Sequence, residues 1–162
     1  MATHIPKTNA ARLLDTAGVA YSLHAAEVDV HDLSAVTLAR TLGVPDAQVY
    51  KTLVARGDRH GVFMACIPAA ASLDMKKAAR ATGDKHVEMV ALNEVLPLTG
   101  YVRGGCSPLG ARKSYPVYLD ESAILQERIF VSAGQRGIQL CLAPDDLLRV
   151  SGGSYADLAR EE

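Results

Sequence analysis

The stretch of sequence best suited to handle a substrate is the glycine-rich run of residues 100–110. It holds four glycines and one proline. Glycine allows positive φ and a close approach of the backbone to a ligand, while Pro108 fixes its own φ and favours an extended Ser107. Such a stiff loop can present backbone N–H groups to a polarised carbonyl or a phosphate, as an oxyanion hole does. The same composition also fits a tight turn between two strands, and composition alone leaves both interpretations open.

Lys51 is a second candidate, because it occupies an apolar run where a solvated lysine is unexpected. Period-two alternation places it on the same strand face as Val49 and Leu53. If that face points inward, Lys51 needs a function. Both faces of the run are apolar and a lysine can extend its charged end to solvent, so the pattern alone also allows an ordinary surface role.

The cysteines and histidines show no pattern typical of covalent or metal chemistry. Cys66, Cys106 and Cys141 are odd in number, lie far apart and form no CxxC motif. Cys106 lies in the glycine-rich loop, where backbone dipoles can lower a thiol pKa, but no histidine is near it in the sequence to act as a base. We therefore interpret Cys106 as part of an apolar pocket wall. The five histidines lack metal-ligand spacing, so we expect neither a metal nor a cofactor.

The elements that must position these residues follow from periodicity and capping signals. Helices are predicted within residues 8–18, 34–42, 72–83, 145–150 and 151–162. Strands are predicted at residues 20–25, 49–55, 62–67, 87–90, 101–102, 117–119, 129–131 and 138–142. The runs 49–55 and 62–67 form a hairpin, and residues 132–137 form a second hairpin connection. The irregular order of helices and strands, without any repeat, predicts an α+β fold with a mixed, mainly antiparallel sheet.

Length and composition limit the organisation of the chain and its setting. A chain of 162 residues with 49% hydrophobic and 22% charged residues is typical of one globular domain. Its net charge of −1 argues against a protein that coats nucleic acid through its overall field, so any such contact must be local. The N-terminal sequence has no apolar signal region, and no run of ~18 apolar residues occurs. We therefore expect a cytoplasmic protein without a membrane span.

Four motifs together make the sequence recognisable. They are Val49 to Leu53, Leu73 to Lys77, Gly104 to Gly110, and Val131 to Gly134 followed by Arg136-Gly137. In this order and spacing they resemble the YbaK/EbsC family of tRNA-editing deacylases, relatives of the insertion domain of bacterial prolyl-tRNA synthetases. The likeness runs over nearly the whole chain. It implies that residues 1–162 form a single editing domain, with a curved mixed, mainly antiparallel sheet and flanking helices, which removes cysteine wrongly esterified to tRNA(Pro).

The resemblance also implies roles for individual residues. Lys51 matches a lysine that the family needs for activity, which is assigned to hold the tRNA 3′ end near its terminal phosphate or ribose. The family's GxxPxG motif falls on Gly105, Pro108 and Gly110, whose backbone shapes the pocket around the ester. Substrate-binding positions are implied for Gly104, Cys106, Ser107, Ser132 and Gly134. Ala26 and Gln139 depart from one branch of the family, which has a tyrosine and an acidic residue there, so substrate choice can differ in detail.

The chemistry that the resemblance implies needs no nucleophile from the protein. An aminoacyl ester is already activated, so orientation and polarisation of its carbonyl can lower the barrier. In the family mechanism the substrate's own thiol attacks the carbonyl, which forms a cyclic thioester and frees the tRNA. A pocket alone would separate amino acids that differ by one methylene by only ~1–3 kcal/mol, so a reaction that requires the thiol adds discrimination.

The expected partner is the acceptor end of a mischarged tRNA. Prolyl-tRNA synthetase is a candidate second partner, because the near-neutral charge of the chain favours only weak binding of tRNA by itself. Two alternatives remain open. One is a deacylase for alanyl-tRNA(Pro) or another small aminoacyl-tRNA that uses water in place of a substrate thiol, and the other is a non-catalytic ligand- or nucleotide-binding module of the same fold.

Overall fold

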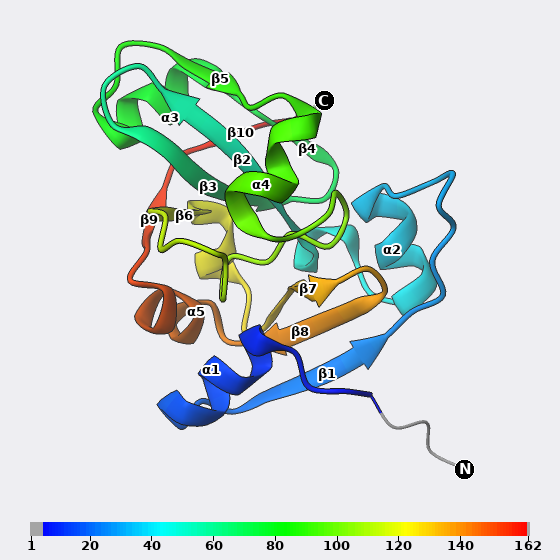
Figure 1. Ribbon diagram of the computed structural model, residues 1–162. Helices are drawn as coiled ribbons and strands as arrows, with labels where there is room; N and C mark the ends of the chain where they lie inside the picture. The colour runs from blue at the N-terminus through cyan, green and yellow to red at the C-terminus, as the bar shows by residue number, and fades with distance from the viewer. Residues whose placement is uncertain (1–4, 162) are drawn as a thin grey trace.

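The computed structural model describes residues 5–161, which form three β-sheets with helices packed around them (Figure 1). The α-helices are α1 (Asn9–Ala17), α2 (Ala35–Leu42), α3 (Met75–Thr82), α4 (Val95–Thr99) and α5 (Pro144–Ser151), and the 3-10 turns are η1 (Asp46–Gln48), η2 (Leu92–Glu94) and η3 (Glu121–Leu125). The strands are β1 (Tyr21–Ala25), β2 (Tyr50–Gly57), β3 (Gly61–Pro68), β4 (Ala71–Leu73), β5 (Val87–Met89), β6 (Val117–Asp120), β7 (Ile129–Gln135), β8 (Ile138–Leu142), β9 (Ser154–Ala156) and β10 (Ala159–Glu161).

The largest sheet has the strand order β5-β2-β3-β6-β9 and is mixed. Its centre is the predicted β2–β3 hairpin, in which Lys51 lies opposite Ile67, while β6 and β9 join in parallel. An antiparallel sheet, β1-β8-β7, meets the start of β2 through a parallel bridge between Val49 and Phe130. A two-stranded sheet pairs β10 with β4. The predicted α+β fold with mixed, mainly antiparallel strands and flanking helices is confirmed, with the strands divided among three sheets.

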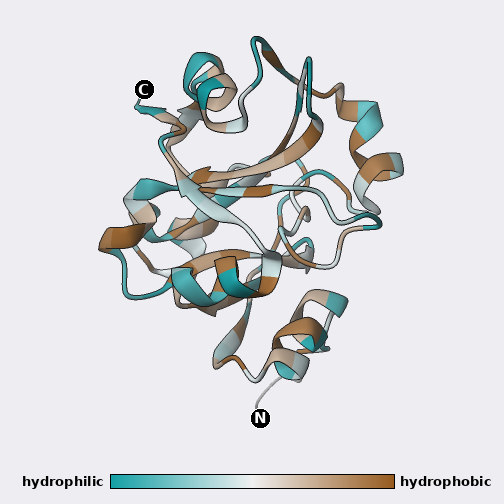
Figure 2. Ribbon diagram, turned by 90° about the vertical axis from the view of Figure 1, so that its left-hand side faces the viewer, coloured by the Kyte–Doolittle hydropathy of each residue, from teal (hydrophilic) through white to brown (hydrophobic). Residues whose placement is uncertain are grey.

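The β2–β3 hairpin is buried on both faces, because it lies between two apolar clusters. Tyr50 and Val54 of β2 belong to the main cluster, which also holds side chains of α1, β7 and β8. Ala55 of β2 and Ile67 of β3 face a second cluster that includes residues of α3. Figure 2 shows the apolar stretches along the inner strands and the hydrophilic stretches on the helices around them. A strand buried on both faces reads as a continuous apolar run, which explains why the sequence pattern of β2 was ambiguous.

Helix α3 begins later than the sequence predicted. Ser72 and Leu73 belong to β4, and the N-cap is Asp74, whose carboxylate accepts hydrogen bonds from the backbone N–H groups of Lys76 and Lys77. Aspartate is one of the strongest N-cap residues, so Asp74 sets the start of the helix. The buried Leu73 instead pairs with Ala159 of β10.

The C-terminal segment and residues 101–102 also differ from prediction. Residues 151–162 were expected to form a helix, but Gly152 ends α5 in a left-handed conformation and β9 and β10 follow. These strands form because β6 and β4 offer them edges, a long-range effect that local patterns do not encode. Residues 101–102 form no strand. The expected connection at residues 132–137 is mostly strand, because β7 continues through a bulge to Gln135.

Candidate active site

A cavity of about 790 Å³ lies between the start of α2, strand β2, the segment from β5 to α4, the glycine-rich loop and the β7–β8 pair. Lys51 and Gly104 are both on its wall. Cys106, Ser132 and Gln139 line it as well. The cavity therefore brings together four of the predicted site residues from three distant parts of the chain. It also includes Gln139, one of the two positions that depart from a branch of the family.

The cavity opens at a stretch of β2 that has a neighbouring strand on one side only. Strand β3 pairs with the whole of β2, whereas β5 pairs only with residues 55–57 and the bridge from β7 reaches only Val49. Within residues 5–161 no other strand pairs with residues 50–53 on that side. The half-buried Lys51 lies in this stretch, so the unpaired side of β2 and Lys51 both belong to the cavity wall.

The glycine-rich loop is held in shape by hydrogen bonds within itself. The Gly105 N–H donates to the carbonyl of Val102 at 2.9 Å, and the Leu109 N–H donates to the Ser107 hydroxyl at 3.2 Å. The Tyr101 hydroxyl donates to the carbonyl of Leu109 at 2.6 Å and so joins the two ends of the loop. Burial raises the pKa of Tyr101 to about 12, so the hydroxyl keeps its proton at neutral pH. These bonds make the loop stiff without regular secondary structure.

The loop also packs tightly against the β7–β8 hairpin. The Arg136 side chain donates from Nε to the carbonyl of Arg103 at 2.7 Å. A Cβ atom on Gly105 would lie 3.1 Å from the backbone nitrogen of Arg136. Gly134 has φ +103°, and a Cβ there would lie 2.8 Å from the ring of Tyr101. Close packing therefore favours glycine at position 105, and at position 134 both the contact with Tyr101 and the positive φ favour it.

The remaining predicted site residues lie outside the wall of this cavity. Gly105, Ser107 and Gly134 are in the supporting structure just described, and Ser107 is fully buried. Pro108 and Gly110 instead line a smaller cavity of about 200 Å³. Gly105, Pro108 and Gly110 are near the wall residues Gly104 and Cys106 in the sequence but are not on the wall themselves. Their contribution to catalysis therefore stays a prediction.

Gln139 and Ala26, the two residues that depart from one branch of the family, differ in their positions relative to the cavity. Gln139 is only 2% exposed and lies on the cavity wall across from Ser132, its neighbour in the β7–β8 pairing. Ala26 is absent from the wall, and its N–H donates to the carbonyl of Gly137 at 2.7 Å. Of the two departures, only Gln139 can contact a ligand in the cavity directly.

Sequence reasoning missed the polar wall at the start of α2. Asp32 accepts hydrogen bonds from the Thr37 hydroxyl at 2.7 Å and from the Ser34 N–H at 3.1 Å, and both Asp32 and Ser34 line the cavity. The bond from Thr37, followed by those from Ser34, lowers the pKa of the Asp32 carboxyl. The signal for this arrangement was present as Ser34, a good N-cap residue, with an aspartate two positions before it. Arg103 was also missed, although it lies within the loop and on the wall.

The cavity supplies no activated thiol. Burial raises the pKa of Cys106 to about 12, and burial likewise raises that of Cys66 to about 12. The Cys106 thiol therefore remains protonated and serves as an apolar wall, as the sequence suggested. Among residues 5–161, no group of three or more His, Cys, Asp or Glu side chains could hold a metal ion.

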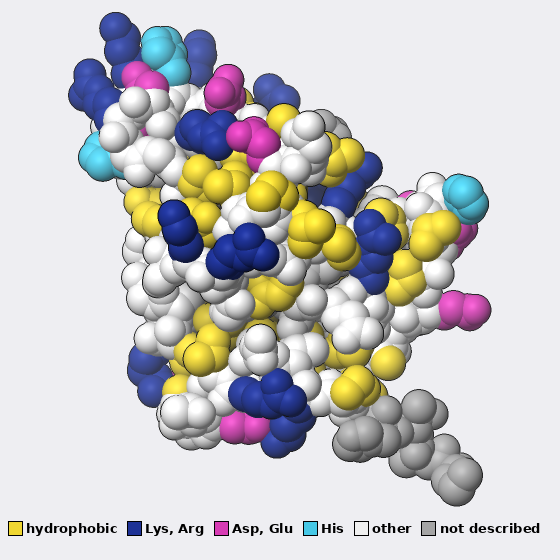
Figure 3. Space-filling view, viewed as in Figure 1, with side chains coloured by type: hydrophobic (Ala, Val, Ile, Leu, Met, Phe, Trp, Pro, Cys, Tyr) yellow, Lys and Arg dark blue, Asp and Glu magenta, His cyan; other side chains and the backbone are white. Residues whose placement is uncertain are grey.

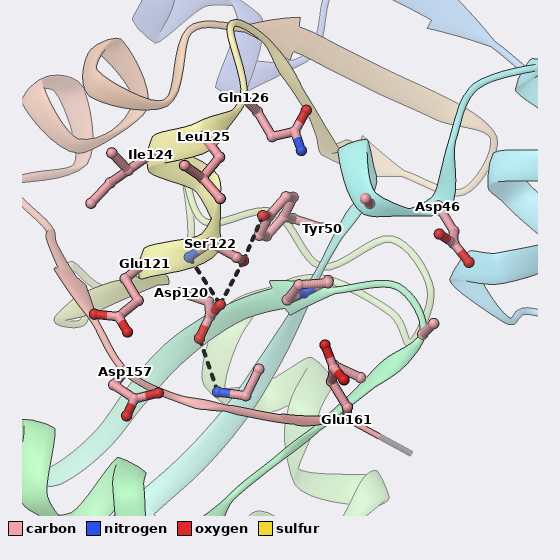
Figure 4. Close-up of a pocket in the computed structure, with 15 residues that line it drawn as sticks. Asp46, Tyr50, Asp120, Glu121, Ser122, Ile124, Leu125, Gln126, Asp157 and Glu161 are labelled. Atoms are coloured by element: carbon pink, nitrogen blue, oxygen red, sulfur yellow. Dashed lines mark hydrogen bonds between the residues drawn. The ribbon is translucent and has the colours of Figure 1, made fainter.

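A second cavity of about 790 Å³ has the opposite electrostatic character (Figure 4). Its lining includes carboxylates, listed here: Asp46, Asp120, Glu121, Asp157 and Glu161. None of its lining residues is Lys, Arg or His. Asp120 accepts from the Leu158 and Ala159 N–H groups at 3.0 and 2.9 Å and from the Ser122 hydroxyl at 2.6 Å, so it ties the C-terminal segment to β6. An acidic cavity is unsuited to a phosphate chain, which leaves the Lys51 cavity as the candidate site.

Comparisons with known proteins identify the family of this chain. Residues 29–150 match the family of aminoacyl-tRNA editing domains. A protein of Enterococcus faecalis named "Putative Cys-tRNA(Pro)/Cys-tRNA(Cys) deacylase EbsC" is 42% identical over 156 residues, which cover 96% of this chain and 95% of the relative. YwhH of Bacillus subtilis is 34% identical over 70% of this chain and 71% of its own length. A crystal structure of "a putative trans-editing enzyme for prolyl tRNA synthetase" superimposes with a TM-score of 0.78 at 26% identity, covering 96% of this chain and 99% of the other.

Proposed function

Since this chain belongs to the family of aminoacyl-tRNA editing domains and is an aminoacyl-tRNA deacylase, we propose that its substrate is cysteine mischarged onto tRNA(Pro). The name of the Enterococcus relative supports this substrate, and the related crystal structure supports action in trans beside prolyl-tRNA synthetase. The reaction would take place in the cytoplasm, where tRNA is charged and used. Among the described residues, no helix is long and apolar enough to cross a membrane.

The observation that carries the proposal is that Lys51 and the glycine-rich loop share one cavity. A volume of about 790 Å³ lies within the range of small-molecule sites and can hold an adenosine with an attached amino acid. In the proposed arrangement the Lys51 ammonium holds the terminal phosphate or ribose. Backbone donors near Gly104 and Cys106 then polarise the ester carbonyl.

The proposed reaction uses the thiol of the substrate. The sulfur forms a bond to the carbonyl carbon of its own amino acid, the bond from that carbon to the ribose oxygen breaks, and the ribose oxygen receives a proton. The products are a free tRNA and a cyclic thioester, which water then opens to cysteine. Burial raises the pKa of the Cys106 thiol to about 12, so this thiol is a poor nucleophile at neutral pH, and the proposed route needs no nucleophile from the protein. The protein supplies orientation and electrostatic stabilisation.

Deacylation kinetics with Lys51→Ala and Lys51→Arg test the role of the ammonium group. We expect Lys51→Ala to lower kcat/KM for cysteinyl-tRNA(Pro) by about a hundredfold, the value of a charge-assisted contact of ~3 kcal/mol, and Lys51→Arg to keep part of the activity. Lys7→Ala, which changes an exposed lysine that lines neither this cavity nor the one beside Pro108 and Gly110, is the matched control. Activity of Lys51→Ala within threefold of the wild type would contradict the assignment.

A comparison of amino acids on the same tRNA tests the role of the substrate thiol. We expect cysteinyl-tRNA(Pro) to be cleaved much faster than seryl- or alanyl-tRNA(Pro), because serine and alanine lack the thiol. Equal rates for cysteine and alanine would instead support the deacylase that uses water. Binding of all three esters without cleavage would support the non-catalytic module.

We also propose prolyl-tRNA synthetase as a partner that delivers the mischarged tRNA. The net charge of −1 provides little general attraction to tRNA, so a second protein would increase capture. Addition of the synthetase should lower the apparent KM for cysteinyl-tRNA(Pro). An unchanged KM at saturating synthetase would exclude this partner.

A further inference from the structure

Cationic side chains gather at the end of the molecule formed by the β2–β3 turn, the end of α3 and the start of β5. Figure 3 shows Lys, Arg and His side chains together at this end. We call this surface the basic tip and define it as Arg59, His60, Arg80, Lys85 and His86, all of which are exposed. The proposed reaction at the Lys51 cavity uses none of these residues.

Two aspartates hold the parts of the basic tip together. The Asp84 carboxylate accepts from the backbone N–H groups of Arg59 and His60, both at 2.8 Å, and interacts with His60 Nδ1 at 3.0 Å. The Asp58 carboxylate accepts from the N–H groups of Lys85 and His86, both at 3.0 Å. Each aspartate thus anchors the neighbouring turn through its backbone. Both carboxylates accept hydrogen bonds from backbone N–H groups and the His60 ring contacts Asp84, whereas the side chains of Arg59, Arg80 and Lys85 are exposed.

The basic tip is connected to the active-site cavity by two strands. Along β2, the path from Lys51 to Gly57 covers about 20 Å at ~3.3 Å per residue. Along β5, His86 precedes Met89, a residue of the cavity wall, by three positions or about 10 Å. Between the two sites Arg56 is paired with Glu94 at 3.0 Å, and the exposed Glu88 lies opposite Arg56. The basic tip is therefore a separate patch, about 10 to 20 Å along the strands from the cavity wall.

That distance matches the shape of a tRNA end. A single-stranded 3′ end of about four nucleotides spans at least ~14 Å when its bases stay stacked, and more when it is extended. With the terminal adenosine in the cavity, the acceptor duplex would begin at about the distance of the basic tip. RNA duplexes are bound mainly through phosphates and shape, for which arginine and lysine are the usual partners.

We propose that the basic tip binds the phosphate backbone of the acceptor duplex of the tRNA whose 3′ end enters the Lys51 cavity. This inference rests on the proposed function for the identity of the RNA. It assigns the body of the acceptor stem to a surface distinct from the catalytic cavity. Helix α3 can extend the contact, because Lys76 lies one turn before Arg80 on the same exposed face.

A charge-reversal variant with a matched control tests the proposal. The tip variant is Arg59→Glu/Arg80→Glu/Lys85→Glu, which leaves His60 in contact with Asp84. The control is Arg12→Glu/Arg128→Glu/Arg149→Glu, which changes the net charge by the same amount at exposed positions of α1, α5 and the segment before β7. The probe is tRNA(Pro) without an attached amino acid. Circular dichroism with thermal unfolding verifies that both variants fold.

We expect the tip variant to raise the Kd for tRNA(Pro) by about tenfold or more and to reduce the slope of log K against log salt by about 2 to 3, one unit per lost phosphate contact. The control should change the Kd much less. An equal rise of the Kd in both variants would show that tRNA responds only to the net charge of the protein. An unchanged Kd in the tip variant would show that the basic tip does not bind tRNA. Either result overturns the proposal.

A short substrate separates this proposal from the proposed function. The cysteinyl ester of the trinucleotide CCA lacks the duplex, so the tip variant should cleave it as fast as the wild type while Lys51→Ala does not. Loss of cleavage of the short ester in the tip variant would contradict a duplex-binding role. If the wild-type protein cleaves no cysteinyl ester, the proposed function fails, whereas the tRNA-binding measurement still decides the role of the basic tip.

Discussion

Replacement of Asp84 should cause one of the largest losses of stability available from a single polar residue in this chain. The side chain is fully buried and accepts four hydrogen bonds, from the N–H groups of Arg59 and His60, from His60 Nδ1 and from the Thr82 hydroxyl at 2.6 Å. Gly57 leaves the space for it, since a Cβ there would overlap the Asp84 carboxylate. Bonds to a carboxylate contribute more than neutral ones, but water can reach the exposed turn after the change, so we expect Asp84→Ala to cost about 3 kcal/mol.

Thermal unfolding provides the assay. At this chain length ~1 kcal/mol corresponds to about 2–4 °C, so Asp84→Ala should lower the Tm by roughly 6–12 °C. Asp58→Ala is the matched control, because its exposed carboxylate accepts only the two N–H groups of Lys85 and His86, and its Tm should fall much less. A decrease below about 2 °C for Asp84→Ala, or equal decreases for both variants, would refute the reasoning.

The same carboxylate predicts a pH dependence. Burial alone would raise the pKa of Asp84, but the hydrogen bonds from Thr82, from the His60 and Arg59 N–H groups and from the His60 side chain outweigh burial and hold it at about 2, below the ordinary 3.8. A group with a lowered folded-state pKa stabilises the fold above its unfolded pKa, and this contribution is lost as pH falls from about 4 towards 2. The stability difference between wild type and Asp84→Asn, from urea titrations, should therefore shrink over that interval. A difference that is independent of pH would contradict the low pKa.

Three further changes test the support of the site. Gly134→Ala should lower the Tm by about 4 °C or more, because its φ of +103° and the ring of Tyr101 exclude a Cβ; an unchanged Tm would show that the hairpin adapts. Tyr101→Phe should cost about 1 kcal/mol in urea unfolding and raise KM, since the Leu109 carbonyl loses its donor; an unchanged KM would indicate that the loop keeps its shape without this bond. Alkylation of Cys106 by iodoacetamide at pH 8, followed by peptide mass spectrometry, should be about a hundredfold slower in the native than in the urea-unfolded protein, because burial raises its pKa to about 12; equal rates would disprove a buried thiol.

The sequence predicted the parts of the site that depend on local patterns. The β2–β3 hairpin could be read from two β-rich runs and a turn, and this placed Lys51 on a buried strand. Glycine spacing likewise identified the loop with Gly104 and Cys106. Neither pattern encodes which residues meet across the cavity. Ser132 reaches the wall only because β7 bridges to β2 at Val49, a contact between segments far apart in the chain.

The wrong predictions also have long-range causes. A helix was predicted over residues 151–162, yet residues 154–156 and 159–161 form strands, because they pair with the edges of β6 and β4. Helix α4 was missed because Pro97 lies within it, and a proline normally argues against a helix interior. The position of Pro108 and Gly110 on another cavity could not be foreseen either, since the family motif gives their order but not the direction in which each residue faces.

The position of Cys106 on the cavity wall has a consequence for the proposed cleavage of a cysteinyl ester. A reactive protein thiolate in the wall would attack one sulfur of a small disulfide that enters the cavity, form a mixed disulfide with it and release the other sulfur as a thiol, which would block the site. Thiol–disulfide exchange proceeds through the thiolate, and a group with a pKa of about 12 is almost entirely protonated at neutral pH. The burial that makes Cys106 a poor nucleophile thus also protects the cavity from a mixed disulfide with a thiol-containing ligand.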